Sequence, residues 1–235
     1  MADKPIRAPR NRTALMQYLQ RLAMTGHVYW CGDTIVRSKL TNLVDKHSTL
    51  ALRADAPARA YRKRTGRASV HLALSPEVLK AGTSSVDWLM LSTDGTDGLA
   101  TAQRPPAPVR DLRTVDGRLT LYGRRVELVH VEKTVRNGRK KTKKLTTWTW
   151  RFTAQRYREL EAFLIECAKQ HNRERAEEQF RALTQYPQFA GIRTQLFALH
   201  AETNRMLGKM GLPPLPSLDL PKLRILPFWA DGYEI

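Results

Sequence analysis

The segment 126–153 constrains the fold more than any other part of this sequence. Residues 126–135 and 145–153 both alternate apolar and polar side chains, which is the period of a half-buried strand. The short stretch between the two runs contains an Asn-Gly dipeptide, which is typical of hairpin turns. Trp148 and Trp150 fall on the apolar face of the second run. The pattern therefore predicts an antiparallel hairpin with both tryptophans in the core.

The chain before this hairpin mixes helical and strand periods. Apolar spacing at i, i+3, i+4 and i+7 indicates helices over 13–24 and 35–47. Short apolar or alternating runs indicate strands, and a proline-containing stretch over 99–110 indicates a loop. The predicted strands are 28–31, 50–52, 70–74, 86–91 and 119–122.

The chain after the hairpin has the period of helices. Three helices are predicted, the first capped by Thr153, with apolar stripes over 157–167, 176–183 and 192–206. The final stretch carries several prolines and is expected to be extended. The fold class predicted is α+β: a basic body of short, mostly antiparallel strands with helices, then a helical C-terminal part and a Pro-rich tail. The predicted domains are 1–155 (basic, nucleic-acid-binding), 156–211 (helical packing or assembly) and 212–235 (tail).

The charge of the chain is concentrated in its first two thirds. The formal net charge is +18, and residues 1–155 carry +17 of it. So uneven a distribution predicts an anionic partner for the basic part. A nucleic acid, RNA or DNA, fits that expectation best, while an acidic protein, a lipid surface or plain solubility stay open as alternatives.

Two clusters carry much of this charge, and both are expected to project into solvent because unpaired charges are not buried. The first is interpreted as a loop between predicted strands, with a tyrosine as a candidate for stacking on bases. The second lies at the tip of the predicted hairpin. The candidate nucleic-acid-binding residues are Arg59, Tyr61, Arg62, Lys63, Arg64 and Arg67 in the first cluster and Arg136, Arg139, Lys140, Lys141, Lys143 and Lys144 in the second.

Catalytic motifs were sought and none was found in the sequence. It contains no phosphate-binding GxxxxGK[ST] or GxGxxG pattern, no HExxH and only two cysteines. We therefore expect a protein that is not an enzyme and that has no catalytic residues, no metal site and no cofactor. One catalytic alternative stays open, in which His71 and His130 meet and cleave RNA by general acid–base chemistry.

The location of the protein is also constrained by what the sequence lacks. The N-terminal segment has no apolar core of a secretory signal, and no run of about 18 apolar residues is present. These features predict a cytoplasmic protein without a membrane partner.

In overall character the chain resembles the large-subunit-like component of type IV CRISPR effector complexes, which are encoded on plasmids. The resemblance rests on the small basic α+β body, the two basic clusters and the helical end, and on no diagnostic motif. Some members of that family carry paired cysteines for zinc, whereas the segment around Cys31 has a single one, so no site residue is transferred. The resemblance implies a non-catalytic subunit that contacts guide RNA and target DNA backbone beside other protein subunits. The alternatives are a stand-alone DNA-binding accessory protein of a plasmid or mobile element, acting in replication, transfer or regulation, and an RNA-processing endonuclease.

Overall fold

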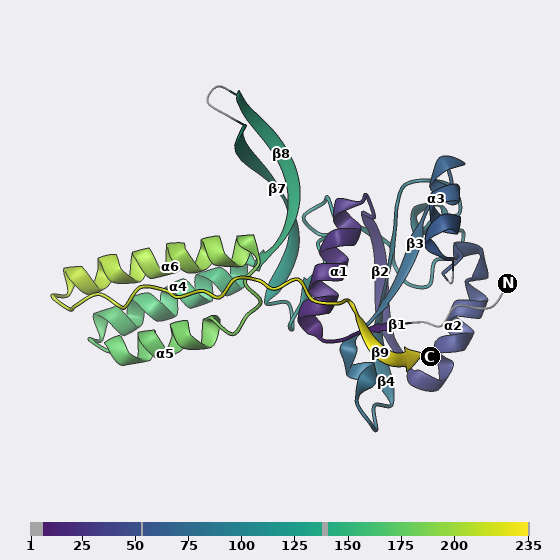
Figure 1. Ribbon diagram of the computed structural model, residues 1–235. Helices are drawn as coiled ribbons and strands as arrows, with labels where there is room; N and C mark the ends of the chain where they lie inside the picture. The colour runs from purple at the N-terminus through teal and green to yellow at the C-terminus, as the bar shows by residue number, and fades with distance from the viewer. Residues whose placement is uncertain (1–6, 53, 138–140, 235) are drawn as a thin grey trace. The chain divides into compact units, whose positions relative to one another are not determined.

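The computed structural model describes residues 7–52, 54–137 and 141–234. The chain forms two compact units, one of residues 1–118 with 225–235 and the other of residues 119–224. Figure 1 shows the elements of both units. The predicted α+β class with a helical C-terminal part is confirmed.

The first unit is built around a four-stranded antiparallel sheet with strand order β3-β4-β2-β5. The long central pair joins β2 and β4 over eight residues each, in register from Tyr29 opposite Ser92 to Val36 opposite Ser85. The strands are β2 (Tyr29–Val36), β3 (Val70–Leu74), β4 (Ser85–Ser92) and β5 (Arg110–Asp111). The strands predicted over 28–31, 70–74 and 86–91 thus correspond to β2, β3 and β4.

Three helices accompany this sheet: α1 (Arg12–Met24), α2 (Leu40–Lys46) and α3 (Ala56–Arg64). Helix α1 begins where the Asn11 side chain accepts a hydrogen bond from the backbone N–H of Ala14, as N-cap residues do. Short 3-10 turns cover Arg37–Lys39, Ser48–Leu50, Pro76–Leu79 and Leu99–Thr101.

Two predictions in this unit are wrong. The strand predicted over 50–52 is instead the end of a 3-10 turn followed by Ala51 in the left-handed region, with φ of 51°. The helix predicted over 35–47 begins later, because Ile35 and Val36 continue strand β2 beside β4. At Ile35 and Val36 the pairing with β4 overrides the helical period, whereas two leucines two residues apart were too short a pattern to define a strand over 50–52.

A small second sheet in this unit pairs the two ends of the described chain. Strand β1 (Arg7–Pro9) is antiparallel to β9 (Trp229–Glu234), with Arg7 opposite Glu234 and Pro9 opposite Trp229. No strand was predicted in either segment. Since the partners are more than 200 residues apart in sequence, neither segment carries a local signal for the pairing.

The second unit consists of a three-stranded antiparallel sheet, β6-β7-β8, and three helices. The strands are β6 (Thr120–Leu121), β7 (Val126–Asn137) and β8 (Lys141–Phe152), and the helices are α4 (Ala154–Lys169), α5 (Arg173–Leu183) and α6 (Ala190–Lys209). The predicted hairpin and the three predicted helices are confirmed, as is the cap at Thr153, whose hydroxyl accepts from Arg156 N.

The compact units divide the chain differently from the predicted domains. The predicted boundary at residue 155 separated the hairpin from the helices, whereas the hairpin and helices form one unit that begins at Leu119. The physical reason is the apolar base of the hairpin, whose Trp150 and Phe152 are fully buried in the core of this unit. Ring contacts with Phe189 and Tyr186, at 6.5 and 5.2 Å between centroids, join that base to the segment before α6.

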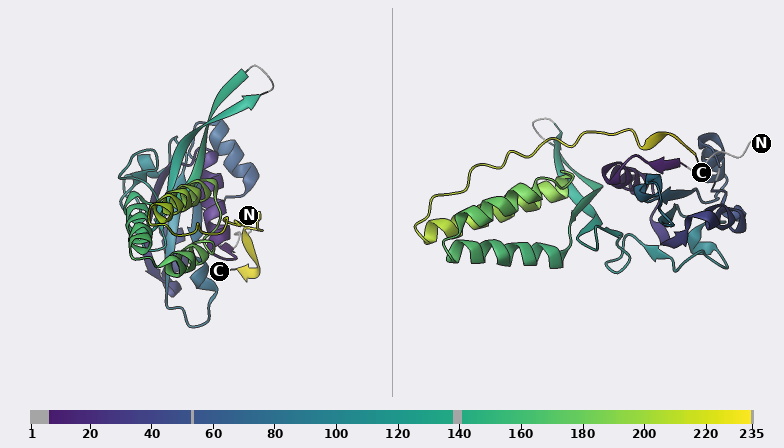
Figure 2. Two further views of the ribbon diagram at one scale, coloured as in Figure 1. Left: turned by 90° about the vertical axis from the view of Figure 1, so that its left-hand side faces the viewer. Right: turned by 90° about the horizontal axis from the view of Figure 1, so that it is seen from below.

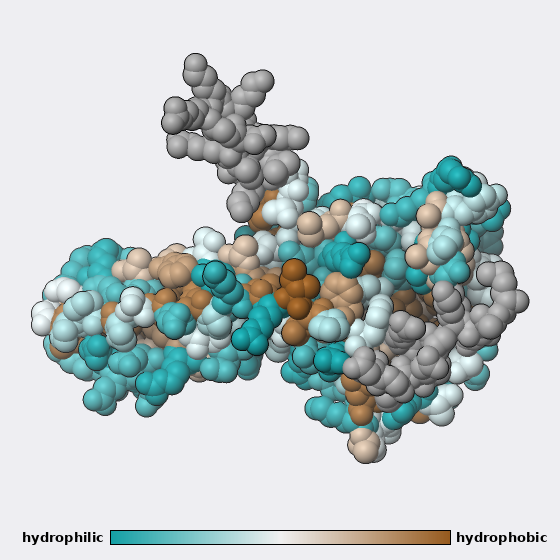
Figure 3. Space-filling view, viewed as in Figure 1, coloured by the Kyte–Doolittle hydropathy of each residue, from teal (hydrophilic) through white to brown (hydrophobic). Residues whose placement is uncertain are grey.

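After α6 the chain continues without helix or strand from about residue 212 to 228, and its part up to residue 224 runs beside the helices of this unit (Figure 2). Side chains of the helices hold its backbone: the Asn204 carboxamide accepts from Leu215 N at 2.7 Å, and Arg193 donates to the carbonyls of Leu220 and Pro221. Leu215 and Leu220 are buried. In Figure 3 brown, hydrophobic patches are visible along the path of this segment, among teal, pale and tan residues of the same unit.

Candidate nucleic-acid interface

The base of the β7–β8 hairpin is fixed to helix α6 by side-chain and backbone hydrogen bonds. Gln195 uses both ends of its carboxamide, accepting from Phe152 N at 2.7 Å and donating to Phe152 O at 3.1 Å. One turn away, the Thr149 hydroxyl accepts from Gly191 N at 3.0 Å. Gly191 has to be glycine here, because a Cβ would come within 2.6 Å of the Trp150 carbonyl oxygen. The hairpin therefore rises from a rigid attachment.

On one face of the base the side chains are buried, and on the other a charged side chain has an ion-pair partner. Trp148 and Trp150 are buried, which confirms the prediction that they are core residues. On the other face Glu127 is 7% exposed and accepts from the Arg151 guanidinium at 2.8 Å. A buried carboxylate with a charged partner is a stable arrangement, whereas one without it would be costly. The base thus has little surface left for a ligand.

Beyond the base the described side chains of the hairpin become more exposed to solvent. His130, Glu132 and Thr146 are exposed, and the paired strands extend past the helices that cover their base (Figure 1). We call residues 131–137 paired with 141–147 the distal ribbon; the two strands stay in register to the pair Asn137 and Lys141. Strand β6 pairs with β7 only at residues 126 and 127, so among the described residues the distal ribbon is two-stranded.

The predicted tip residues fall on this ribbon where they are described. Arg136 is opposite Thr142, Lys143 is opposite Val135 and Lys144 is opposite Thr134. Arg139 and Lys140 lie outside the described residues. Lys133, opposite Leu145, is a further cation of the ribbon that the prediction missed, although the same alternating run contained it. The ribbon holds five Lys or Arg residues and a single acid, Glu132.

The first predicted cluster lies on a helix apart from Arg67, which follows it, and the interpretation of the cluster as a loop is wrong for the other residues. Helix α3 is capped by Asp55, whose carboxylate accepts from Ala58 N at 2.8 Å, and Pro57 sits in its first turn. A proline directly after an apolar run suggests, from sequence alone, the end of a strand. Proline is, however, favoured in the first turn of a helix, where its missing N–H has no partner to lose.

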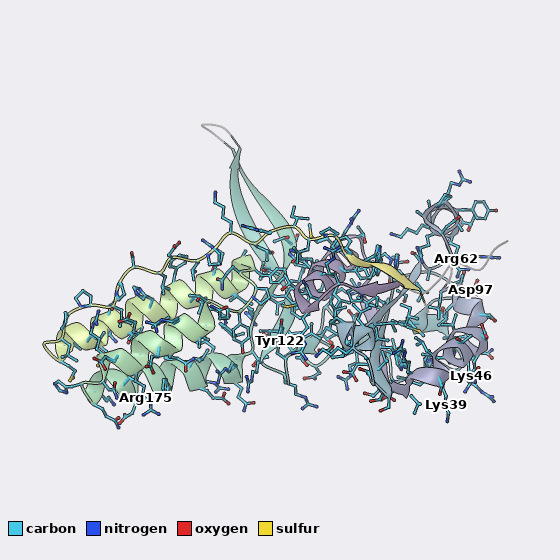
Figure 4. All side chains as sticks on the ribbon, turned by 60° about the horizontal axis from the view of Figure 1, so that its bottom comes forward. Lys39, Lys46, Arg62, Asp97, Tyr122 and Arg175 are labelled. Carbon is cyan, nitrogen blue, oxygen red and sulfur yellow. The ribbon has the colours of Figure 1, made fainter. Side chains whose placement is uncertain are left out.

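Several cations of the first cluster have hydrogen-bond or ion-pair partners within their own unit, more than a projecting cluster would have. Arg62 donates to the carbonyls of Ala68 and Asp97, at 2.8 and 3.3 Å, and Figure 4 shows Arg62 beside Asp97. Lys63 donates to the Thr25 carbonyl at 3.1 Å, and Arg67 pairs with Asp97 at 3.7 Å.

Arg59 departs furthest from the expectation of a projecting charge. It is half-buried, its guanidinium donates to the Leu52 carbonyl at 3.4 Å, and burial lowers its pKa. Tyr61 and Arg64 do project: Tyr61 is 57% exposed, and the Arg64 guanidinium lies 5.4 Å from the centre of its ring. The two predicted clusters belong to different compact units.

A cluster of three titratable side chains, Tyr18, His27 and His71, lies inside the first unit and was not predicted. The rings of His27 and His71 are 4.8 Å apart, and His71 Nδ1 accepts from the Tyr18 hydroxyl at 2.7 Å. His27 Nδ1 lies 3.1 Å from the Leu22 carbonyl and Nε2 lies 3.2 Å from the Ser69 hydroxyl. Because the Leu22 carbonyl can only accept, the contact assigns Nδ1–H as the donor on His27.

Burial keeps these three groups uncharged, and nearby cations add to this effect for the two histidines. Burial first, then Lys63, lowers the pKa of His27 to about 4. Burial first, then Arg59, lowers the pKa of His71 to about 3, and burial raises the pKa of Tyr18 to about 12. The partner of His71 in the structure is thus His27, while His130 packs on Trp148 with ring centres 4.9 Å apart. The alternative in which His71 meets His130 stays a hypothesis, since the two histidines belong to different compact units.

No protein family, curated protein or solved structure matches this chain. Within residues 7–52, 54–137 and 141–234, no group of three or more His, Cys, Asp or Glu side chains is placed to hold a metal ion. Among the helices of the described part of the chain, none has the length and apolar character needed to cross a membrane.

Proposed function

We propose that this chain binds nucleic acid through the distal ribbon, as a non-catalytic component that contacts the phosphate backbone. The observation that carries the proposal is a two-stranded ribbon with five cations that extends from a rigid, fully satisfied base. Lys and Arg bind phosphate oxygens, and each contact releases counterions condensed on the nucleic acid. Such contacts position a protein without reading sequence.

Helix α3 is a second, weaker contact surface in this proposal. Tyr61 with Arg64 offers an exposed aromatic ring beside a guanidinium, an arrangement suited to stacking on an unpaired base. The remaining cations of the helix have partners within the first unit, so we assign most of the electrostatic attraction to the distal ribbon.

The non-catalytic part of the proposal is supported by the burial of two of the three acid–base groups that cluster in the first unit. His27 is 3% exposed and Tyr18 is 8% exposed, so a phosphodiester would have to displace core side chains to reach them. An RNA-processing endonuclease remains the catalytic alternative. Cleavage of RNA by the wild-type chain that is lost in a His71→Asn variant of normal stability would establish it in place of our proposal.

Within this function, the form suggested by resemblance is a subunit of a type IV CRISPR effector complex that contacts guide RNA and target DNA. The alternative is a stand-alone DNA-binding accessory protein of a plasmid or mobile element. Purification from the native host at low salt separates the two. A complex subunit brings stoichiometric guide RNA and protein partners, whereas a stand-alone binder purifies alone and shifts duplex DNA.

The test of the binding function uses the full chain with Arg136, Lys141, Lys143 and Lys144 changed to Ala. Binding to labelled nucleic acids is measured by fluorescence anisotropy over a series of salt concentrations. Loss of four phosphate contacts should flatten the plot of log K against log salt by about 3 to 4 on a duplex, at ~0.9 per contact.

A matched control removes the same charge elsewhere in the second unit. It changes one Arg and three Lys on exposed positions of the helices and tail to Ala: Arg158, Lys169, Lys209 and Lys222. This control should keep nearly the wild-type slope. Equal slopes for wild type and ribbon variant, or equal losses in ribbon variant and control, would refute the proposed site.

A further inference from the structure

We propose that the distal ribbon enters the major groove of B-form duplex DNA, so that its natural ligand is duplex DNA and not RNA or a single strand. This inference rests on the proposed function and specifies its ligand. It uses the length of the ribbon, the register of its cations and the side-chain chemistry that the ribbon lacks.

The dimensions of the ribbon suit a deep and fairly wide groove. Seven residues of each strand lie beyond the base, and at ~3.3 Å per residue they span roughly 23 Å. The major groove of B-DNA is about 8.5 Å deep and about 12 Å wide and admits a two-stranded ribbon. The ribbon is thus long enough to reach the floor of the groove while the covered base stays outside it.

The register places cations at positions that alternate between the two faces of the ribbon. Directly opposite residues of an antiparallel pair share a face. Arg136 and Lys144 occupy positions of one face, while Lys141 and Lys143 occupy positions of the other. A ribbon that lay flat on a phosphate surface would need cations on one face only. A ribbon inside a groove has a phosphate wall on each side, and cation positions on both faces match that geometry.

The ribbon lacks the side chains that single-stranded binding uses. Residues 131–147 contain no Phe, Tyr, Trp or His, so this segment has no ring on which an unpaired base could stack. Duplex RNA is disfavoured for a different reason. Its A-form major groove is deep and narrow and excludes protein side chains, and its accessible minor groove is shallow. Neither RNA groove fits a long, narrow ribbon.

The experiment compares the full chain on probes of one sequence and length, by anisotropy at one salt concentration. The probes are duplex DNA, duplex RNA and single-stranded DNA. A further duplex DNA carries glucosylated 5-hydroxymethylcytosine, whose sugar fills the major groove. The last sample is plain duplex DNA saturated with distamycin, which occupies the minor groove. The ribbon variant described above is measured on the same set.

We expect plain duplex DNA to bind at least tenfold more tightly than duplex RNA, single-stranded DNA and the glucosylated duplex, and distamycin to change little. In the ribbon variant the preference for plain over glucosylated duplex should disappear. Equal affinity for plain and glucosylated duplex, a loss caused by distamycin, or tighter binding to either RNA or a single strand would overturn the inference while leaving the nucleic-acid-binding function intact. Failure to bind any probe at low salt would instead overturn the proposed function.

Discussion

The buried pair His27 and His71 makes the stability of the first unit depend on pH in a way that can be worked out in advance. In the native state both imidazoles are held neutral, with pKa values lowered to about 4 and about 3, mainly by burial. In the unfolded chain a histidine titrates near pKa 6.5. Below that pH the unfolded state binds more protons than the native state, so stability is full above about pH 6.5 and is lost as the pH falls toward the native values.

The magnitude at about pH 5 follows from the unfolded pKa alone. An imidazole that stays neutral in the native state lowers the free energy of unfolding when the same residue is protonated in the unfolded chain. The loss is about 1.4 kcal/mol per pH unit below 6.5, hence about 2 kcal/mol at pH 5. The two histidines together cost about 4 kcal/mol. Domains have total stabilities of about 5–15 kcal/mol, so this loss is large enough to measure without difficulty.

The assay is urea unfolding at about pH 8 and about pH 5, with the wild type and two single variants. His71→Asn keeps an acceptor for the Tyr18 hydroxyl near the position of Nδ1 but cannot be protonated. It should reduce the difference in unfolding free energy between the two pH values by about 2 kcal/mol. The control, His171→Asn, changes an exposed histidine and should leave that difference unchanged. If the unfolding free energy of His71→Asn changed between the two pH values as much as that of the wild type, the conclusion that native His71 is neutral at pH 5 would be refuted.

Two further predictions concern the second unit. Gly191→Ala should lower the unfolding free energy by about 1–3 kcal/mol, because its Cβ would lie 2.6 Å from the Trp150 carbonyl oxygen. Thermal melts measure this loss, and an unchanged Tm would contradict the close approach. Arg193→Met should speed proteolytic cleavage within residues 212–224, since Arg193 donates hydrogen bonds to the carbonyls of Leu220 and Pro221. Mass spectrometry locates the cleavage site, and an unchanged cleavage rate would show that these hydrogen bonds do not hold the tail in place.

The candidate interface was readable from sequence because its signal is local. Alternating side chains around an Asn-Gly turn predict a hairpin, and cations near the turn have to be on the surface whatever the rest of the chain does. The burial of Trp148 and Trp150 followed from the same alternation. The helices after Thr153 were predicted for an equally local reason, their amphipathic period and cap.

For the cluster on α3, the sequence predicts the charge but not the conformation. Its residues were found because charge is visible in a sequence, but their conformation and availability were not. Pro57 lies in the first turn of a helix and not in a loop. Arg59 and Arg62 donate to backbone carbonyls that only the folded chain brings near. The number of cations is thus a property of the sequence, whereas the number free to bind a ligand depends on tertiary contacts.

The sequence by itself determined the class of fold, the hairpin, the C-terminal helices and the excess of positive charge, because each depends on residues close together in the chain. The tertiary structure decided what depends on residues far apart. It joined the hairpin to the helices in one unit, paired β1 with β9 across more than 200 residues, and set His71 beside His27 in a buried site. Such contacts form only when the chain offsets the entropy of closing long loops by burying apolar surface, and no short window of sequence contains that balance.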